Sequence, residues 1–180
     1  MMPLKATSIL FILIVACGAS GSGITSTTTS VEQAETLVCE QLQVVRDMAN
    51  EVSLMSATGR IAPIAGEDID EAALLAEMHA VALFLDEKTP NILAAYEEAA
   101  VGAENLADLA ADIRQVADLT AVLNPLLIEA MSNVTSFSDF SPMEALVSDP
   151  ALMQQAISAG EAALRVDAFT IPTCGFKLSS

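Results

Sequence analysis

The side chains best suited to acid–base or metal chemistry are scarce and poorly spaced in this sequence. His79 is the only histidine, and the nearest upstream carboxylate, Glu77, stands two residues before it. The Glu-x-x-His spacing of di-iron bundles is therefore absent, and one histidine cannot supply a multi-histidine zinc site. Glu97 and Glu98 are adjacent, so they leave a helix on different sides and make a poor acid–base pair. We predict that His79 is a surface or packing residue.

Motifs that mark common catalytic and binding sites are also missing. The chain has no Gly-x-Ser-x-Gly, no glycine-rich phosphate loop and no Cys-x-x-Cys. The acidic stretch 66–71, GEDIDE, lacks the spacing and the terminal glutamate of a twelve-residue calcium loop. The sequence therefore predicts no enzymatic activity, no cofactor and no metal site.

Cysteine is the remaining reactive residue, and Cys17 directly follows an apolar run. Residues 1–5 supply a weak positively charged start, and the run within 6–16 is too short to cross a hydrocarbon core about 30 Å thick. A segment of this length is typical of a signal peptide. We therefore expect export, and we expect no transmembrane helix in the rest of the chain.

The residues that end this run, Ile14-Val15-Ala16-Cys17, resemble the lipobox of bacterial lipoproteins. In that class the cysteine thiol receives a diacylglyceryl group, and the leader is cut immediately before the cysteine. The resemblance covers only the first 17 residues. It implies a signal peptide at 1–16 and a fatty-acylated Cys17 that attaches the protein to the outer face of the cell membrane or to the outer membrane. Two acyl chains anchor stably, whereas one binds marginally.

An ordinary signal peptide is the alternative explanation of this leader. Cleavage after Gly18, Ala19 or Ser20 would remove Cys17 and give a freely secreted protein. Both explanations predict export, and they differ in whether the protein stays attached to the cell.

The remainder of the chain predicts a tether followed by one domain. After Cys17, the tether at 17–30 continues as GASGSGITSTTTS, which has no charge and a composition typical of flexible coil. Residues 31–180 are about the size of one domain. Abundant alanine and leucine, with 4% aromatic residues and no tryptophan, favour an all-α fold.

Hydrophobic periodicity and capping residues predict about four main helices in an up-down bundle. Val31, Val38, Val45 and Val52 recur every seven residues and mark the buried face of a helix over 31–57. A loop at 58–67 follows. Acidic residues then open a helix over 69–88, and Thr89-Pro90 has the form of an N-cap and first residue of the next helix.

The most regular pattern lies after Pro90. Eight residues alternate steps of four and three, which predicts one long helix over 90–123: Ile92, Tyr96, Ala99, Ala103, Leu106, Ala110, Ile113 and Ala117. Whether Gly102 kinks or breaks this helix is left open. Asn124-Pro125 would end it and start a short helix to 132.

Proline dipeptides mark the helices of the C-terminal part. Ser141-Pro142 opens a short helix, and Asp149-Pro150 opens the last long helix, over 150–168. The remaining stretch, FTIPTCGFKLSS, is predicted to be a non-helical tail that contains Cys174.

The other two cysteines form a natural pair if Cys17 is lipidated. An exported location permits a disulfide. Cys39 lies about two turns into the first predicted helix and Cys174 lies just past the last, and in an up-down bundle the start of the first helix lies beside the end of the fourth. We predict a Cys39–Cys174 disulfide that pins the tail, with two free buried thiols as the alternative.

The net charge of the chain limits the classes of molecule that it could bind. The chain has 24 acidic and 7 basic side chains, a net charge of −17, which repels nucleic acids and anionic head groups and disfavours association between copies. We expect a lipid-anchored envelope protein with a binding or structural role, whose partner is another envelope protein. The alternative is a carrier that holds a small hydrophobic ligand between its helices.

Overall fold

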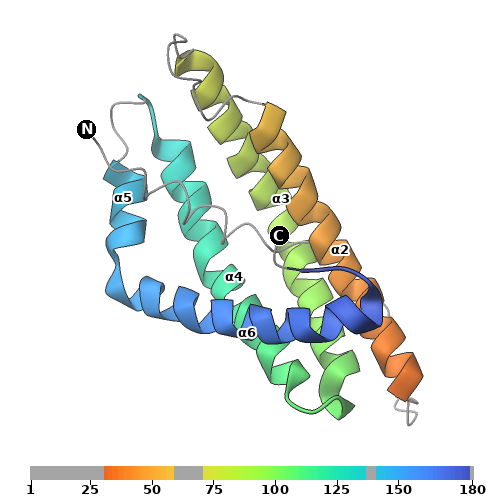
Figure 1. Cartoon of the computed structure of the whole chain (residues 1–180). Helices are drawn as coiled ribbons and strands as arrows, with labels where there is room; N and C mark the ends of the chain where they lie inside the picture. Colours follow the sequence, from red (N-terminus) through yellow and green to blue (C-terminus); the bar gives the residue numbers. More distant parts are fainter. Residues whose placement is uncertain (1–30, 59–70, 137–140, 179–180) are drawn as a thin grey trace.

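The computed structural model describes residues 31–58, 71–136 and 141–178, and every regular element in these ranges is helical (Figure 1). In chain order they are α2 (Val31–Thr58), α3 (Glu71–Gly102), the 3-10 turn η1 (Ala103–Asn105), α4 (Leu109–Asn133), α5 (Ser141–Ser148) and α6 (Pro150–Cys174). The predicted all-α class with about four main helices is confirmed. The predicted signal peptide 1–16, the tether 17–30 and all but the first residue of the predicted 58–67 loop lie outside the described residues.

The first three long helices run antiparallel to their neighbours, and α6 lies across them (Figure 1). α3 packs against both α2 and α4, and α6 packs mainly against α4 and reaches α2 near its own end. No helix in the described segments is both long and apolar enough to cross a membrane.

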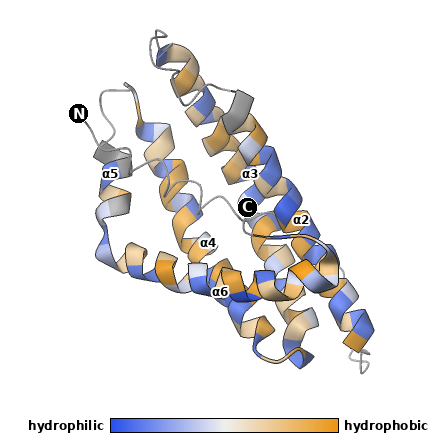
Figure 2. Cartoon of the chain, viewed as in Figure 1, coloured by the Kyte–Doolittle hydropathy of each residue, from blue (hydrophilic) through white to orange (hydrophobic). Residues whose placement is uncertain are grey.

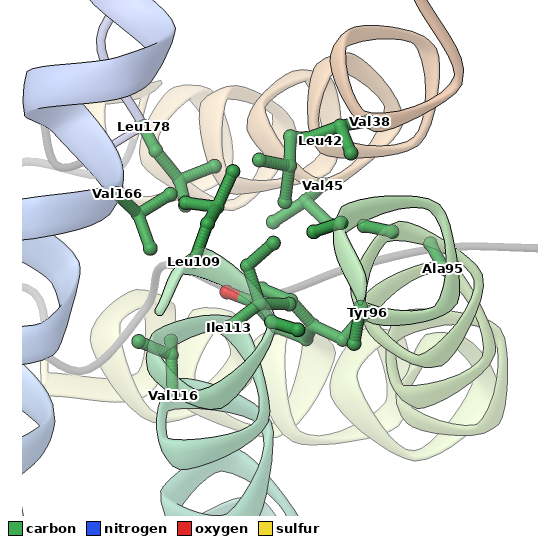
Figure 3. Packing of buried hydrophobic residues seen from close by; sticks show 14 of the residues in the cluster. Val38, Leu42, Val45, Ala95, Tyr96, Leu109, Ile113, Val116, Val166 and Leu178 are labelled. Carbon is green, nitrogen blue, oxygen red and sulfur yellow. The ribbon is translucent and has the colours of Figure 1, made fainter. Parts of the chain in front are cut away.

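Two clusters of apolar side chains hold these helices together. The larger one joins α2, α3, α4, α6 and the chain end, and its fully buried side chains include Leu42, Tyr96 and Ile113 (Figure 3). The smaller one joins the other ends of α2, α3 and α4 around Val52 and Leu85. Each long helix thus buries one apolar face in at least one of the two clusters.

The predicted valine stripe is confirmed over three of its four positions. Val38, Val45 and Val52 are completely buried, whereas Val31, at the first residue of α2, is exposed. The predicted helix 31–57 agrees with α2, because one apolar face and an uninterrupted run of helix-forming residues determine it locally.

The predicted division between the second and third helices is wrong. The chain does not end a helix at 88 and begin another at Pro90, because α3 continues through Pro90 to Gly102. Proline removes one backbone donor from a helix and usually bends or breaks it. Here Thr89 does not cap a new helix: its hydroxyl donates to the Leu85 carbonyl at 2.6 Å and accepts from the Asn124 amide of α4 at 3.0 Å.

The predicted single helix over 90–123 is also wrong, because the chain reverses direction at 102–108. α3 ends at Gly102, η1 follows, and Ala107 has a left-handed φ of 50° before α4 begins. A Cβ at Gly102 would lie 3.1 Å from the Leu37 side chain of α2, so glycine permits a close approach of α3 to α2. The break that the sequence left open at Gly102 is therefore real.

Both C-terminal long helices extend beyond their predicted ends. α4 continues through Pro125 to Asn133, so no separate short helix begins there. α6 begins at Pro150 as predicted, with the Asp149 carboxylate accepting from the Ala151 and Leu152 amides, but it runs through Pro172 to Cys174 instead of ending at 168. The short helix opened by Ser141-Pro142 is confirmed as α5.

Candidate functional site

The structure joins Cys39 and Cys174 in a disulfide, as the sequence predicts. Their Cα atoms are 5.3 Å apart, and the bond connects residues separated by 135 positions. Cys39 lies in the third turn of α2, and Cys174 is the last residue of α6 rather than part of a non-helical tail. The disulfide therefore ties the end of α6 to the start of the bundle.

The chain end after Cys174 is held by side chains from two helices, α2 and α6. Gly175 adopts a left-handed conformation that ends α6, and Phe176 and Leu178 are then buried. The buried Asp167 carboxylate accepts the Leu178 amide at 2.7 Å, and the Arg46 guanidinium of α2 lies 4.8 Å from the centre of the Phe176 ring. We call the disulfide and these contacts the C-terminal clasp.

A second charged contact fixes α6 to α4. The Nε atom of Arg165 donates to both carboxylate oxygens of Asp112, at 2.9 and 3.1 Å. The Nη2 atom of Arg165 lies 2.8 Å from Oδ1 of Asp112. Asp112 is buried, whereas Arg165 is largely exposed. The hydrogen bond to Asp112 raises the pKa of Arg165 above its ordinary value.

His79 links two helices. Its Nε2 atom lies 3.1 Å from the carbonyl oxygen of Val134, the residue that ends α4. A neutral imidazole with the proton on Nε2 would donate to this carbonyl, which has no partner within the helix. The contact ties an exposed residue of α3 to the end of α4, which agrees with the predicted surface or packing residue.

The carboxylates that the sequence singled out do not converge. Glu97 is exposed and Glu98 is half-buried, so the two side chains diverge on α3. Most of the acidic stretch 66–71 lies outside the described residues. Across 31–58, 71–136 and 141–178, no group of three or more histidine, cysteine or acidic residues is placed to hold a metal ion.

Two surface hollows of about 350 Å³ each lie in the part of the chain that the structure describes. One lies between α4 and α6 and is lined by Gln115, Asp118, Leu119, Val122, Gln154, Gln155 and Ser158. The other lies where Pro90 and Pro125 face each other, and it is lined in addition by Asp86, Thr89, Ile128 and Glu129. Both are lined by polar and apolar side chains together.

Replacing Thr170 with valine is expected to raise the free energy of unfolding by about 1 kcal/mol, because the Thr170 hydroxyl is fully buried on α6 and has no hydrogen-bond partner. Thr120→Val is the matched control, since the buried Thr120 hydroxyl donates to the Val116 carbonyl at 3.0 Å. Urea unfolding of both variants measures the difference, and a gain at Thr120 equal to that at Thr170 would contradict the explanation.

Cys17, the predicted lipidation site, lies outside the described residues. Of the predicted site residues, the structure brings together Cys39 and Cys174. No family model, curated protein or solved structure matches the chain, and its function is therefore inferred from its own residues.

Proposed function

We propose that this chain is an exported bacterial lipoprotein, attached to the cell envelope through acyl chains on Cys17. Its helical domain then has a binding or structural role rather than a catalytic one. The lipobox-like residues Ile14-Val15-Ala16-Cys17 are the sequence basis for this proposal.

The cysteine pairing is the observation that carries the proposal. Three cysteines are an odd number, which in an exported protein leaves one to be explained. Cys39 and Cys174 are joined to each other, so no other cysteine of the chain remains to pair with Cys17. A thiol consumed by lipidation accounts for this remainder, and a stable disulfide agrees with an oxidising compartment outside the cytoplasm.

The use of the buried polar groups supports a structural or binding role. The two buried carboxylates in the described segments, Asp112 and Asp167, hold Arg165 and the Leu178 amide. The buried Asn124 donates to Thr89. A catalytic carboxylate would need to face a substrate, whereas these groups are oriented toward other parts of the fold.

The acidic surface agrees with attachment through lipid alone. A net charge of −17 repels anionic head groups, so the domain does not add electrostatic attraction to the membrane. Two acyl chains supply a stable anchor without that contribution. The uncharged residues 18–30 would place the domain about 20 Å from the anchor if they behave as a flexible coil.

Metabolic labelling with a fatty-acid analogue tests the anchor. In a bacterial host, the full chain is expected to take up label and to sediment with membranes, and globomycin is expected to accumulate the uncut precursor. Cys17→Ser is expected to carry no label. Cys39→Ser is the matched control and should be labelled like the wild type. An unlabelled wild type, or equal label on Cys17→Ser, would overturn the proposal.

A further inference from the structure

The outer side of α6 carries large aliphatic side chains that the fold leaves exposed. Ile157 and Ile171 are each 53% exposed and Leu164 is 63% exposed. The buried side of the same helix consists of smaller residues, including Ala159, Ala162, Val166 and Thr170. In Figure 2, hydrophobic residues recur along the length of α6. These three large aliphatic side chains are therefore exposed to solvent, which is the reverse of an ordinary amphipathic helix.

This side of α6 is also nearly free of net charge. Its 25 residues include only three charged ones, Glu161, Arg165 and Asp167. Asp167 is buried, and Glu161 and Arg165 have opposite signs one helical turn apart. By contrast, α2 exposes four acidic side chains, Glu32, Glu40, Asp47 and Glu51. α6 therefore contributes less charge repulsion between copies than α2 does.

The exposed residues are arranged symmetrically about Leu164. Ile157 and Ile171 lie seven residues on either side of it, and Gly160 and Ala168 lie four residues on either side. With 3.6 residues per turn, these five positions follow one stripe along the helix. A stripe with the same spacing in both directions is self-complementary to a second, antiparallel copy, as a two-fold contact requires.

The packing of the described residues does not require a glycine at position 160. A Cβ built on it would meet nothing within 4 Å, so no neighbouring helix requires its small size. Glycine in a helix interior costs about 1 kcal/mol relative to alanine. A glycine beside large exposed aliphatics instead suits the close approach of another helix from outside.

We propose that α6 is the docking surface for a second copy of this chain, with the two α6 helices antiparallel and the two-fold axis passing Leu164. In this arrangement Leu164 packs against the partner's Leu164, and Ile157 packs against the partner's Ile171. Gly160 faces the partner's Ala168, where two small residues let the helices approach. The apolar stripe is buried, and the strongly acidic helices stay apart.

A lipid surface fits this side of α6 less well. Helices that lie in a membrane interface flank their apolar side with lysine or arginine and often carry tryptophan. α6 has a single basic residue, Arg165, which is held by Asp112. Its one aromatic residue, Phe169, packs against the larger core cluster.

Sedimentation of the purified full chain in mild non-ionic detergent over a range of concentrations tests the proposal. The wild type is expected to associate reversibly to a dimer, and Leu164→Glu is expected to weaken association at least about tenfold, because it buries a charge beside its own copy. Leu83→Glu is the matched control, since Leu83 is a similarly exposed leucine on α3, and it should leave the dimer unchanged.

Thiol crosslinking in intact cells provides a second measurement on the anchored protein. Leu164→Cys should give a covalent dimer with a short bismaleimide, since the residue lies on the proposed axis, whereas Leu83→Cys and the wild type should not. A wild type that stays monomeric, or equal effects at Leu164 and Leu83, would overturn the proposal. A monomer whose vesicle binding depends on Leu164 would also overturn it and would identify lipid as the occupant.

Discussion

Replacing both Cys39 and Cys174 with serine is expected to lower the free energy of unfolding by about 2–5 kcal/mol. The disulfide closes a loop of 135 residues, which spans nearly the whole domain. In the chain-entropy model, a long loop removes much conformational freedom from the unfolded chain, so opening it favours unfolding. This is a large fraction of the stability of an ordinary domain.

Urea unfolding followed by circular dichroism measures this effect. The native helical signal of the double variant should match that of the wild type, because Phe176, Leu178 and the Asp167 contact hold the chain end without the covalent bond. Reduction of the wild type should give the same loss. Cys17→Ser is the control and should leave the midpoint unchanged. A double variant as stable as the wild type would contradict a covalent role for the clasp.

Local sequence patterns predicted most of the helical content correctly. α2 follows directly from its valine stripe, and the Asp149-Pro150 and Ser141-Pro142 dipeptides mark the starts of α6 and α5. These signals act within one or two helical turns, so they need no knowledge of the rest of the fold. Agreement between an apolar face and a cap was not sufficient everywhere, because Thr89-Pro90 and the regular pattern after it also agreed on a helix over 90–123 that the structure does not have.

The errors arise where a local signal has two meanings. Proline can be the first residue of a helix or an interior residue whose lost hydrogen bond is tolerated. Pro90, Pro125 and Pro172 are all interior residues of long helices. At Pro90, tertiary contacts favour the continuous helix, because Asn124 reaches Thr89 from the neighbouring helix. No pattern around Thr89 in the sequence identifies that partner.

The reversal at 102–108 was hidden by continuity of the hydrophobic pattern. Ile92, Tyr96 and Ala99 of α3 and Ala110 and Ile113 of α4 belong to the same core cluster. Both helices therefore direct their apolar faces toward the same cluster. The spacing of apolar residues continues across the turn, as it would in one uninterrupted helix. The sequence raised Gly102 as a possible break, but the close approach of Gly102 to Leu37 of α2 depends on the tertiary structure and is not visible in the pattern.

The clasp was predictable in part. Counting cysteines and placing them at the two ends of a bundle identified the disulfide between Cys39 and Cys174. The hydrogen bond from the Leu178 amide to Asp167 was not predicted. A charged residue at a buried helical position signals a specific partner, but the identity of that partner depends on where the chain runs after α6.

Leu42→Ala is expected to lower the free energy of unfolding by about 2–5 kcal/mol, the range for a leucine removed from a packed core. Leu42 is 0% exposed and lies in the larger cluster with Ile113 of α4 and Val166 of α6 (Figure 3). The cavity left by the smaller side chain would weaken contacts among three helices at once, and neighbouring side chains fill it only partly.

Leu54→Ala is the matched control for this prediction, because Leu54 lies on the same helix and is 65% exposed. Its effect should stay within about 0.5 kcal/mol. Urea unfolding with the disulfide intact keeps the unfolded states comparable, so the difference between the variants reports on packing alone. Equal losses at Leu42 and Leu54 would contradict the assignment of the Leu42 side of α2 as the face that packs on the bundle. A loss confined to Leu42 would establish that α2 belongs to the cooperative core that the clasp closes.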